Sequence, residues 1–355
     1  MQPSVAVVIL NWNGKGFLKE YLPSFLKTTY KNHKLYVADN GSSDDSISFM
    51  ETTYPDINII KLDKNYGFAG GYNKALDQVN ADYLAIVNSD LEVTPTWLEP
   101  MVEMLSRDAT IAACQPKIKW LRMDTHFEYA GAAGGFIDTL GYPFCRGRLF
   151  DILESDNNQY DTEKEIFWAT GACFLVKTGI FKSLGGFDED FFAHMEEIDL
   201  CWRIKNEGYK IMYTPMSTIY HLGGGTLNTE NPKKTFLNFR NSLIAMQKNL
   251  PSNQVFGKIF VRMCLDLAAW FKFALSGKIK HAFAINKAHA QFVFKQGKWI
   301  KKRQMTSQKN LNPTGIYKRS IVWDYYVRKK RLFSELNAQD FEGELKGAPG
   351  IDGKI

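Results

Sequence analysis

The sequence lacks the patterns that would mark a disulfide-bonded or membrane-spanning protein. Its five cysteines are scattered over 355 residues with no C-x-x-C spacing. This excludes a disulfide framework and a structural zinc site, and it favours a reducing compartment. No run of about eighteen uncharged apolar residues occurs, so we expect no membrane-spanning helix. No basic segment precedes the first apolar run, so we expect no signal peptide.

Acidic residues are scarce in one part of the chain. Residues 251–304 contain eleven Lys and Arg but a single acid, Asp266, whereas the whole chain has a net charge of only +6. A basic block beside a slightly acidic remainder favours an anionic surface as a partner. Nucleic acid is disfavoured because no familiar nucleic-acid-binding motif is present. A P-loop and a G-x-G-x-x-G sequence are also missing.

The N-terminal part alternates between strand-like and helix-like segments. Continuous apolar runs, typical of strands buried on both faces, occur at residues 5–10, 35–38, 57–62, 83–87 and 111–118. Helical spacing lies between them, at residues 16–28, before about residue 79, and from 95 to about 105. This alternation predicts an α/β fold with a parallel sheet and covering helices.

The remainder of the chain is expected to form three further regions. Residues 120–165 are irregular and glycine-rich, and we interpret them as a long surface excursion suited to binding a substrate. Strands and helices are predicted again up to about residue 230. Helical patterns follow over residues 231–305, and a tail over 306–355. We therefore expect a catalytic domain at 1–230, with halves at about 1–118 and 119–230, then a helical region and a tail.

The helical region has two interpretations. Within residues 255–275, Lys258, Arg262 and Asp266 share one narrow stripe, and apolar residues surround the rest. Such a helix can lie in a membrane interface with Lys and Arg against lipid head groups. The alternative is a helical subdomain packed on the sheet, or an oligomer contact. We favour membrane association.

Two acidic motifs are the main candidates for catalysis. Asn88-Ser89-Asp90 follows a buried strand, where α/β sheets bind ligands. Asp90 is the metal candidate, because oxygen-bound Mg²⁺ or Mn²⁺ neutralises the charge that develops on a diphosphate leaving group. Glu196 or Glu197, at the start of a predicted helix, can act as a general base. The structural alternatives are helix capping by Asp90 and dipole complementation by the glutamates.

Three other positions are weaker candidates. Asp39 ends a predicted strand and can accept a hydrogen bond from a nucleobase, or cap the following loop. His221 precedes the glycines at 223–225 and can bind a metal or diphosphate, or be structural. The glycines within residues 65–73 let a ligand approach the backbone, and the following helix N-terminus favours phosphate. The alternative for that segment is a tight turn.

In combination, these motifs make the sequence resemble the family 2 glycosyltransferases, most closely the rhamnosyltransferase-like branch of bacteria. The resemblance spans about residues 4–245. It rests on eight segments in the family's order: VVILNWNG at 7–14, VADNGSSD at 37–44, NYGFAGGYN at 65–73, NSD at 88–90, TGACFLV at 170–176, GGFDEDFF at 185–192, EEIDLCWR at 196–203 and HLGGGT at 221–226.

The resemblance implies a GT-A fold, with a Rossmann-like, mostly parallel central sheet, covering helices and a C-terminal helical segment. It implies an inverting transfer of a sugar, with rhamnose as one candidate, from a nucleotide-diphosphate donor to a saccharide hydroxyl. The acceptor would be lipid-linked, as in cell-surface polysaccharide synthesis at the inner face of a bacterial plasma membrane. An oligomer is left open.

The resemblance also implies residue roles. Glu197 or Glu196 would be the base, and Asp90 and His221 would hold Mg²⁺ or Mn²⁺. The donor would contact Asn11, Asn13, Asp39, Asn65, Gly67, Asn73, Asn88 and Ser89, and the acceptor would contact Trp168, Gly171, Ala172 and Asp199.

Two departures from the family pattern stand out. Asn88 replaces the first Asp of the Asp-x-Asp metal motif, and Glu197 replaces the usual Asp, which leaves Glu196 open as the base. Asn88 is the reason to keep an alternative, a catalytically inactive glycan- or nucleotide-binding module on the same fold. A sugar-nucleotide pyrophosphorylase is disfavoured, because residues 10–17 lack a glycine-rich basic loop.

Overall fold

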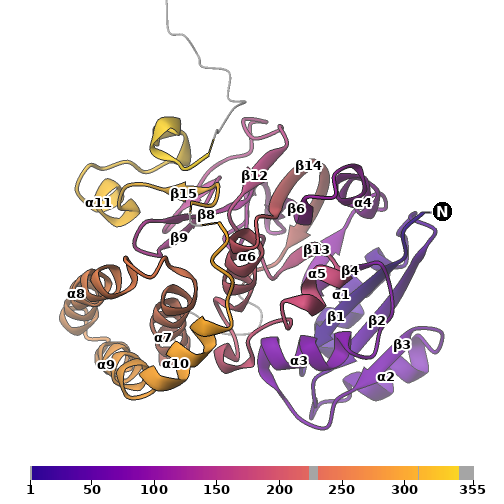
Figure 1. Ribbon diagram of the computed structural model, residues 1–355. Helices are drawn as coiled ribbons and strands as arrows, with labels where there is room; N and C mark the ends of the chain where they lie inside the picture. Colours follow the sequence, from indigo (N-terminus) through magenta and orange to yellow (C-terminus); the bar gives the residue numbers. More distant parts are fainter. Residues whose placement is uncertain (1, 224–230, 311, 344–355) are drawn as a thin grey trace, which may run out of the picture.

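A ten-stranded mixed sheet forms the centre of the computed structural model, which describes residues 2–223, 231–310 and 312–343 (Figure 1). Its main strand order is β12-β14-β6-β13-β4-β1-β2-β3, with β5 paired to β14 and β7 to β6. The strands are β1 (Val5–Asn11), β2 (His33–Asp39), β3 (Asn58–Lys61), β4 (Tyr83–Asn88), β5 (Leu91–Val93), β6 (Ile111–Trp120), β7 (Met123–Phe127), β12 (Lys164–Ile166), β13 (Cys173–Lys177) and β14 (Lys210–His221).

The N-terminal half of this sheet is parallel, as predicted. Strands β3, β2, β1 and β4 are adjacent and run in one direction, so their carboxyl ends lie along one edge. Strand β13 is antiparallel to both β4 and β6, which makes the complete sheet mixed. The carboxyl edge of the parallel half is where an α/β sheet binds ligands.

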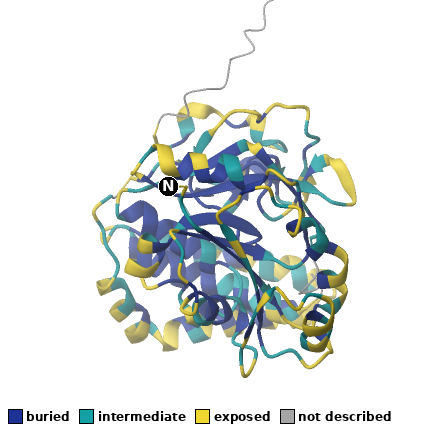
Figure 2. Cartoon of the chain, turned by 90° about the vertical axis from the view of Figure 1, so that its right-hand side faces the viewer, coloured by how far each residue is buried: buried dark blue, intermediate teal, exposed yellow. Residues whose placement is uncertain are grey.

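The alternating side chains of β1 explain why its apolar run is continuous. Val5, Val7 and Ile9 belong to one hydrophobic core, with residues of α1 (Lys15–Phe25), α2 (Ser46–Thr53) and α4 (Leu98–Arg107). Ala6 and Val8 belong to the other core, with residues of α3 (Gly67–Leu76), α5 (Thr178–Ser183) and α6 (Glu196–Asn206). Both faces of the strand are therefore buried, and Figure 2 shows these strands as buried beneath the helices.

Residues 120–165 are more regular than the sequence indicates. After β7 they form the short strands β8 (Gly135–Asp138), β9 (Pro143–Cys145), β10 (Arg148–Leu149) and β11 (Ile152–Leu153) of a second, five-stranded sheet. Gly147 has φ 101°, and a Cβ there would lie 2.8 Å from Phe127 Cγ. Glycine at this tight turn lets the hairpin pack against the core. Strands of two to four residues are too short to give a clear periodic pattern.

The predicted tail is folded over most of its described length. Strand β15 (Ile316–Tyr317) pairs in parallel with β8, and helix α11 (Ile321–Tyr326) follows it. The short helices η2 (Phe333–Glu335) and η3 (Ala338–Asp340) come next. Tyr317, Phe333 and Phe341 join an aromatic cluster with Phe136 and Phe144. This burial is the physical reason why the segment is not a free tail; residues 344–355 lie outside the described part.

Four helices make up the predicted helical region. They are α7 (Pro232–Asn249), α8 (Val255–Leu275), α9 (Ile279–Phe294) and α10 (Gln296–Gln304). Helix α9 packs on both α7 and α8 (Figure 1). No helix within the described residues is long and apolar enough to cross a bilayer.

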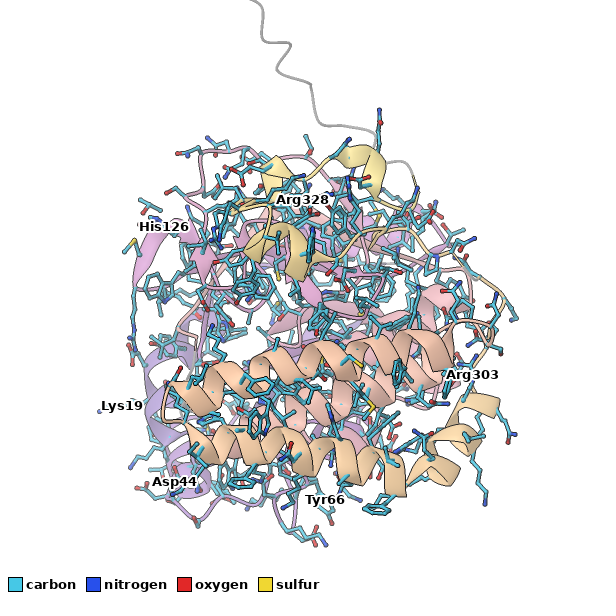
Figure 3. The ribbon with its side chains drawn as sticks, turned by 90° about the vertical axis from the view of Figure 1, so that its left-hand side faces the viewer. Lys19, Asp44, Tyr66, His126, Arg303 and Arg328 are labelled. Carbon is cyan, nitrogen blue, oxygen red and sulfur yellow. The ribbon has the colours of Figure 1, made fainter. Side chains whose placement is uncertain are left out.

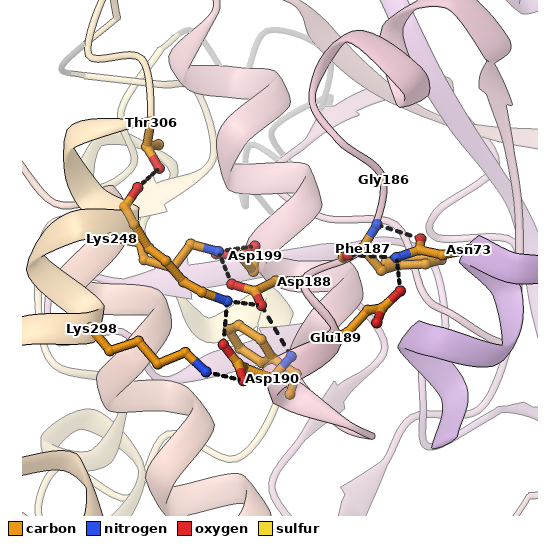
Figure 4. A network of polar contacts seen from close by, with 12 residues as sticks. Asn73, Gly186, Phe187, Asp188, Glu189, Asp190, Asp199, Lys248, Lys298 and Thr306 are labelled. Atoms are coloured by element: carbon orange, nitrogen blue, oxygen red, sulfur yellow. Dashed lines mark hydrogen bonds and ion pairs between the residues drawn. The ribbon is translucent and has the colours of Figure 1, made fainter. Parts of the chain in front are cut away.

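Ion pairs bind this helical region to the sheet domain (Figure 4). Lys248 of α7 lies 2.8 Å from both Asp188 and Asp199, while Lys302 of α10 pairs with Asp188 and Asp190. Burial opposes ionisation of Asp188, but the neighbouring lysines outweigh it and hold the pKa of that carboxyl well below its ordinary value. Part of the basic block is therefore used inside the protein.

Candidate active site

A cavity of about 620 Å³ opens at the carboxyl edge of the parallel strands. The predicted site residues that line it are Asn13, Asn65, Gly67, Asn88, Ser89, Asp90, Gly171, Ala172, Glu196, Glu197 and His221. They come from strand ends, from the start of α3, from the turn before β13, and from the first turn of α6. The structure thus brings both acidic motifs to one cavity of a size that holds a small ligand.

Asp90 and His221 are neighbours in this cavity. Asp90 Oδ1 lies 3.2 Å from His221 Nε2, because β5 pairs with the end of β14 directly after Asp90. On its other side, His221 Nδ1 lies 3.2 Å from Glu128 Oε1. Burial disfavours the charged imidazole, but Glu128 and Asp90 outweigh it and raise the pKa of His221 to about 10. Residues 224–226 of the predicted HLGGGT motif lie outside the described part of the chain.

The two glutamates open α6 from a strained turn. Phe192, His194 and Met195 have φ values of 64°, 69° and 73°, which non-glycine residues rarely adopt. Asn241 Nδ2 lies within hydrogen-bonding distance of the carbonyl oxygens of residues 191, 193 and 194, at 3.0, 3.0 and 2.7 Å. These contacts offset the strain and fix the direction from which α6 enters the cavity.

Burial sets the ionisation of both carboxyls. It raises the pKa of Glu197 to about 7, although backbone hydrogen bonds around residues 197, 198 and 171 oppose the increase. Burial and the charge of Glu197 raise the pKa of Glu196 well above its ordinary value. The Oε2 atoms of both residues lack a hydrogen-bond partner among the described residues. Buried carboxyls with raised pKa values and free oxygens are typical of groups that exchange protons with a ligand.

Backbone and amide contacts shape the side of the cavity at residues 40–67. Asn40 Nδ2 donates to the Gly67 carbonyl at 2.9 Å, and Gly67 N donates to Asn65 Oδ1 at 2.8 Å. The N–H groups of Phe68 and Ala69 both donate to the Phe192 carbonyl. The first turn of α3 is therefore capped by protein, which corrects the expectation that this helix terminus receives a phosphate.

Three predicted residues hold the framework and do not line the cavity. Asn73 donates to the Phe187 carbonyl at 2.8 Å and accepts from its N–H at 2.9 Å, which clamps a turn. Trp168 is buried and donates its indole N–H to the Phe136 carbonyl at 2.8 Å. Asp199 is fully buried and accepts a hydrogen bond from Arg203 Nε at 2.9 Å. A donor role for Asn73 and acceptor roles for Trp168 and Asp199 do not fit these positions.

Asn11 and Asp39 also lie outside the cavity lining, although their chain neighbours Trp12 and Asn40 belong to it. The two residues are paired across adjacent strands, with Asn11 Nδ2 donating to Asp39 Oδ2 at 3.0 Å. Asp39 Oδ1 accepts from Ser42 N at 2.9 Å. They therefore support the loops that form this wall, and Asp39 has the loop-capping position considered above.

Sequence reasoning missed several lining residues. Lys233 and Lys234, at the start of α7, and His194 before α6 all face the cavity. Burial lowers the pKa of His194 to about 4, with a further contribution from Lys234, so its imidazole is neutral at pH 7. Its Nε2 has no partner among the described residues. The cavity geometry identifies all three residues. The sequence offered one signal for the lysines, the Asn-Pro pair that starts the basic helix α7, and none for His194.

A mixed sheet whose parallel half ends at a cavity lined by carboxyl, amide and imidazole groups is typical of nucleotide-binding α/β enzymes. Comparison with known proteins identifies the family. Residues 6–185 match "Glycosyl transferase family 2", and the chain belongs to that family. The predicted GT-A fold and rhamnosyltransferase-like type are both confirmed.

Curated relatives are about a quarter identical to this chain over the aligned residues. The N-acetylglucosaminyl-diphospho-decaprenol L-rhamnosyltransferase of Mycobacterium tuberculosis is 25% identical over 239 residues, which are 62% of this chain and 76% of that protein. The low-salt glycan biosynthesis hexosyltransferase Agl10 of Haloferax volcanii is 22% identical and covers 74% of this chain and 80% of its own length. The O-antigen biosynthesis protein RfbC of Myxococcus xanthus is 26% identical, but only 17% of it is covered.

Solved structures share the fold. The mannosyltransferase PcManGT of Pyrobaculum calidifontis, in complex with GDP-Man and Mn²⁺, aligns with a TM-score of 0.51 and 16% identity. The alignment covers 86% of this chain and 85% of that one. GalNAc-T7, with UDP, GalNAc and Mn²⁺, aligns with the same TM-score over 62% of this chain and 43% of that one.

Proposed function

We propose that this glycosyltransferase moves a hexose, with rhamnose as the leading candidate, from a nucleoside diphosphate to a hydroxyl of a lipid-linked saccharide, with inversion. One observation carries the proposal: Glu197 and the Asp90–His221 pair line the same cavity. A proton acceptor and an anion-stabilising group are the two functions that such a transfer needs.

Glu197 is the better base of the two glutamates. With a pKa of about 7, it is substantially ionised at neutral pH and still basic enough to accept the proton of an attacking hydroxyl. Burial and the charge of Glu197 raise the pKa of Glu196 well above its ordinary value, which favours its protonated form and makes it the weaker candidate. The hydroxyl oxygen bonds to the anomeric carbon as the diphosphate leaves with the bonding electrons. One carboxylate base without a separate nucleophile favours single displacement, and therefore inversion.

The residues fit a divalent cation of the kind that the fold family uses. Two ligands at right angles, each about 2.1 Å from one cation, are separated by about 3 Å; the Asp90 and His221 atoms are 3.2 Å apart. Glu128 Oε1 lies 3.2 Å from His221 Nδ1 and would orient the ring, so that Nε2 would hold the metal once its proton, which the raised pKa of His221 retains at neutral pH, is released. No described group of three or more His, Cys, Asp or Glu could hold a metal, so diphosphate oxygens would complete the shell. Bound Mg²⁺ or Mn²⁺ supplies neutralisation of the departing diphosphate.

The start of α7 supports a diphosphate-bearing acceptor. Lys233 and Lys234 line the cavity, and Asn231 caps the helix by accepting from Lys233 N at 2.9 Å. Asn231 caps the first N–H groups of this helix, so the two lysine side chains, with the helix dipole, are what favour an anion here. The mycobacterial relative is named for a diphospho-decaprenol substrate. We extend this to an acceptor on the inner membrane face, with residues 1–118 binding the donor and 119–230 the acceptor.

A donor panel with two site variants tests the proposal. We expect turnover of a dTDP- or UDP-sugar that requires Mg²⁺ or Mn²⁺, and at least about a hundredfold loss of kcat in Glu197→Gln and in Asp90→Asn. Glu103→Gln, an exposed carboxylate on α4, is the matched control and should keep full activity. Donor binding with no turnover in the unmodified protein would instead support the inactive binding module, and full activity of Glu197→Gln would exclude it as the base.

A further inference from the structure

Helix α8 has its charged side buried and its apolar side exposed. Arg262 and Asp266 are both buried and paired at 3.0 Å, and Asp266 also lies 3.1 Å from His289 of α9. Tyr142 stacks under the Arg262 guanidinium, 3.6 Å from the ring centre. The sequence predicted the reverse, with this stripe towards lipid head groups. Arg262 and Asp266 face inward because both charges find partners there.

The outward side of α8 is a continuous apolar stripe. Residues 256, 260, 264, 267, 271 and 275 are spaced by three or four, so they share one face of the helix. Phe256 and Leu275 are 85% and 88% exposed, and Phe260, Leu267 and Phe271 are also exposed. Such a row of large apolar side chains in water is unfavourable and marks an interaction surface.

Helix α9 continues this surface. Its exposed apolar residues include Ile279, Phe283, Val293 and Phe294, of which Phe294 is 88% exposed. Figure 3 faces this side and shows α8 and α9 side by side across the molecule. At the end of α8, Lys272 lies over the ring of Tyr326, and Trp323 and Val327 of the α11 segment are exposed there as well. We call the exposed apolar residues of α8 and α9 the apolar face.

The charges around the apolar face have one sign. The exposed lysines of this region include Lys272, Lys278, Lys280, Lys287, Lys295 and Lys301; Lys298 is also exposed but pairs with Asp190. Asp266 is the only acid of residues 251–304, and it is buried. In a two-fold contact between copies, this rim would oppose lysine to lysine with no carboxylate to pair. An apolar surface bordered by lysines is instead complementary to an anionic lipid leaflet.

We propose that the apolar face docks on an anionic bilayer, with its phenyl rings among the acyl chains and the surrounding lysines at the head groups. The docking is interfacial, because the described helices are not long and apolar enough to cross a bilayer. Helix α9 is joined to α7, whose first turn lines the cavity, through Thr235 Oγ1 and His281 Nδ1 at 2.7 Å. Docking thus sets the cavity beside the membrane; that this presents a lipid-linked acceptor rests on the proposed function.

The chain contains its own reporter for this test. Cys264 lies in the apolar stripe and is exposed, whereas the other four cysteines are buried. The folded protein, labelled at Cys264 with an environment-sensitive fluorophore, is titrated with vesicles of phosphatidylcholine with or without phosphatidylglycerol. We expect a blue shift, and quenching by acyl-chain quenchers, with the anionic vesicles. An unchanged spectrum and no co-sedimentation of unlabelled protein would overturn the proposal.

Matched variants separate insertion from charge attraction. Phe260→Ser with Phe271→Ser should weaken partitioning by about tenfold for each ring, and Lys280→Glu with Lys287→Glu by at least about fivefold for each lysine. Met216→Ser and Lys31→Glu change exposed residues on other elements and should bind as the parent does. Vesicle binding by the phenylalanine variant equal to that of the parent would overturn insertion. A different result would also overturn it: a parent protein that does not bind vesicles but forms a concentration-dependent dimer, which the phenylalanine variant abolishes.

Donor binding provides the independent readout. Thermal stabilisation by a nucleoside diphosphate with Mn²⁺, measured without vesicles, should be the same in all of these variants, because none of them lines the cavity. Vesicle docking without nucleotide binding would support membrane docking by the apolar face and refute the proposed function. Nucleotide-sugar turnover without docking would support the proposed function and overturn the docking proposal.

Discussion

The buried carboxyl of Glu197 should make the protein less stable as the pH rises, and Glu197→Gln should remove this effect. Because the pKa of Glu197 is raised in the folded protein, from 4.5 to about 7, folding favours its protonated form. The stability from this preference is complete below the unfolded pKa and is lost as the pH rises through about 7. The opposite sign would apply to a carboxylate held by a salt bridge.

The magnitude follows from the two pKa values. Ionising Glu197 in the folded protein costs about 3 kcal/mol of unfolding free energy at pH 8 and about 1 kcal/mol at pH 5. For 355 residues, the entropy of unfolding converts the larger figure into about 4 °C of Tm. Glutamine keeps the shape of the side chain but has no charge to bury. The variant should therefore gain stability relative to the parent at pH 8 while losing activity.

Thermal melts of Glu197→Gln and the parent at pH 5 and pH 8 measure this effect. The difference in Tm should grow with pH, while Glu103→Gln, on the exposed side of α4, should show the same small offset at both values. A Tm difference that is equal at the two pH values would refute the reasoning, because it would show that Glu197 is not titrating between them. Loss of stability at pH 8 would show that its carboxylate has a stabilising partner.

Three further outcomes are expected. The rate kcat should fall below about pH 7 as Glu197 is protonated, and a pH-independent rate over this range would contradict its role as base. Asn241→Ala should destabilise the 192–195 turn by about 1–3 kcal/mol, measured by urea unfolding, and should reduce kcat, measured by turnover. Unchanged stability and unchanged kcat would show that the turn keeps its conformation without the Asn241 hydrogen bonds. Glu128→Gln should weaken Mn²⁺ activation by about 10- to 100-fold, seen as a raised half-saturating Mn²⁺ concentration. Nucleotide binding measured without Mn²⁺ should be unchanged in this variant.

The parallel half and the ends of its strands were predictable because their signals are local. Residues 5–10 of β1 are all apolar, as their two-sided burial requires. Asp90 follows the equally apolar β4 at the edge where ligands bind. By contrast, β8 and β15 are short strands far apart in the sequence, and their pairing depends on tertiary contacts that no local pattern reports.

The orientation of helices was harder to predict than their position. The bounds of α8 agree with the predicted range, yet its charged stripe faces inward. The partners of this stripe are Tyr142 and His289, and neither belongs to α8 itself. In α6, Glu197 and Asp199 are two residues apart and so point about 200° from each other. That angle made it improbable that both would serve the cavity, and the structure directs Asp199 towards α7.

This division of α6 into two sides explains how the protein tolerates two buried glutamates whose Oε2 atoms have no hydrogen-bond partner among the described residues. One side bears Glu196 and Glu197, whose burial raises the pKa of both carboxyls, so that ionising Glu197 near neutral pH opposes folding. The other side bears Asp199, whose carboxylate accepts from Lys248 at 2.8 Å and Asn249 at 2.9 Å. Burial opposes its ionisation, but Lys248 and the neighbouring arginine outweigh it and keep the pKa of Asp199 below its ordinary value. Asp199 therefore stabilises the helix where no substrate reaches, and so holds the reactive carboxyl in the cavity.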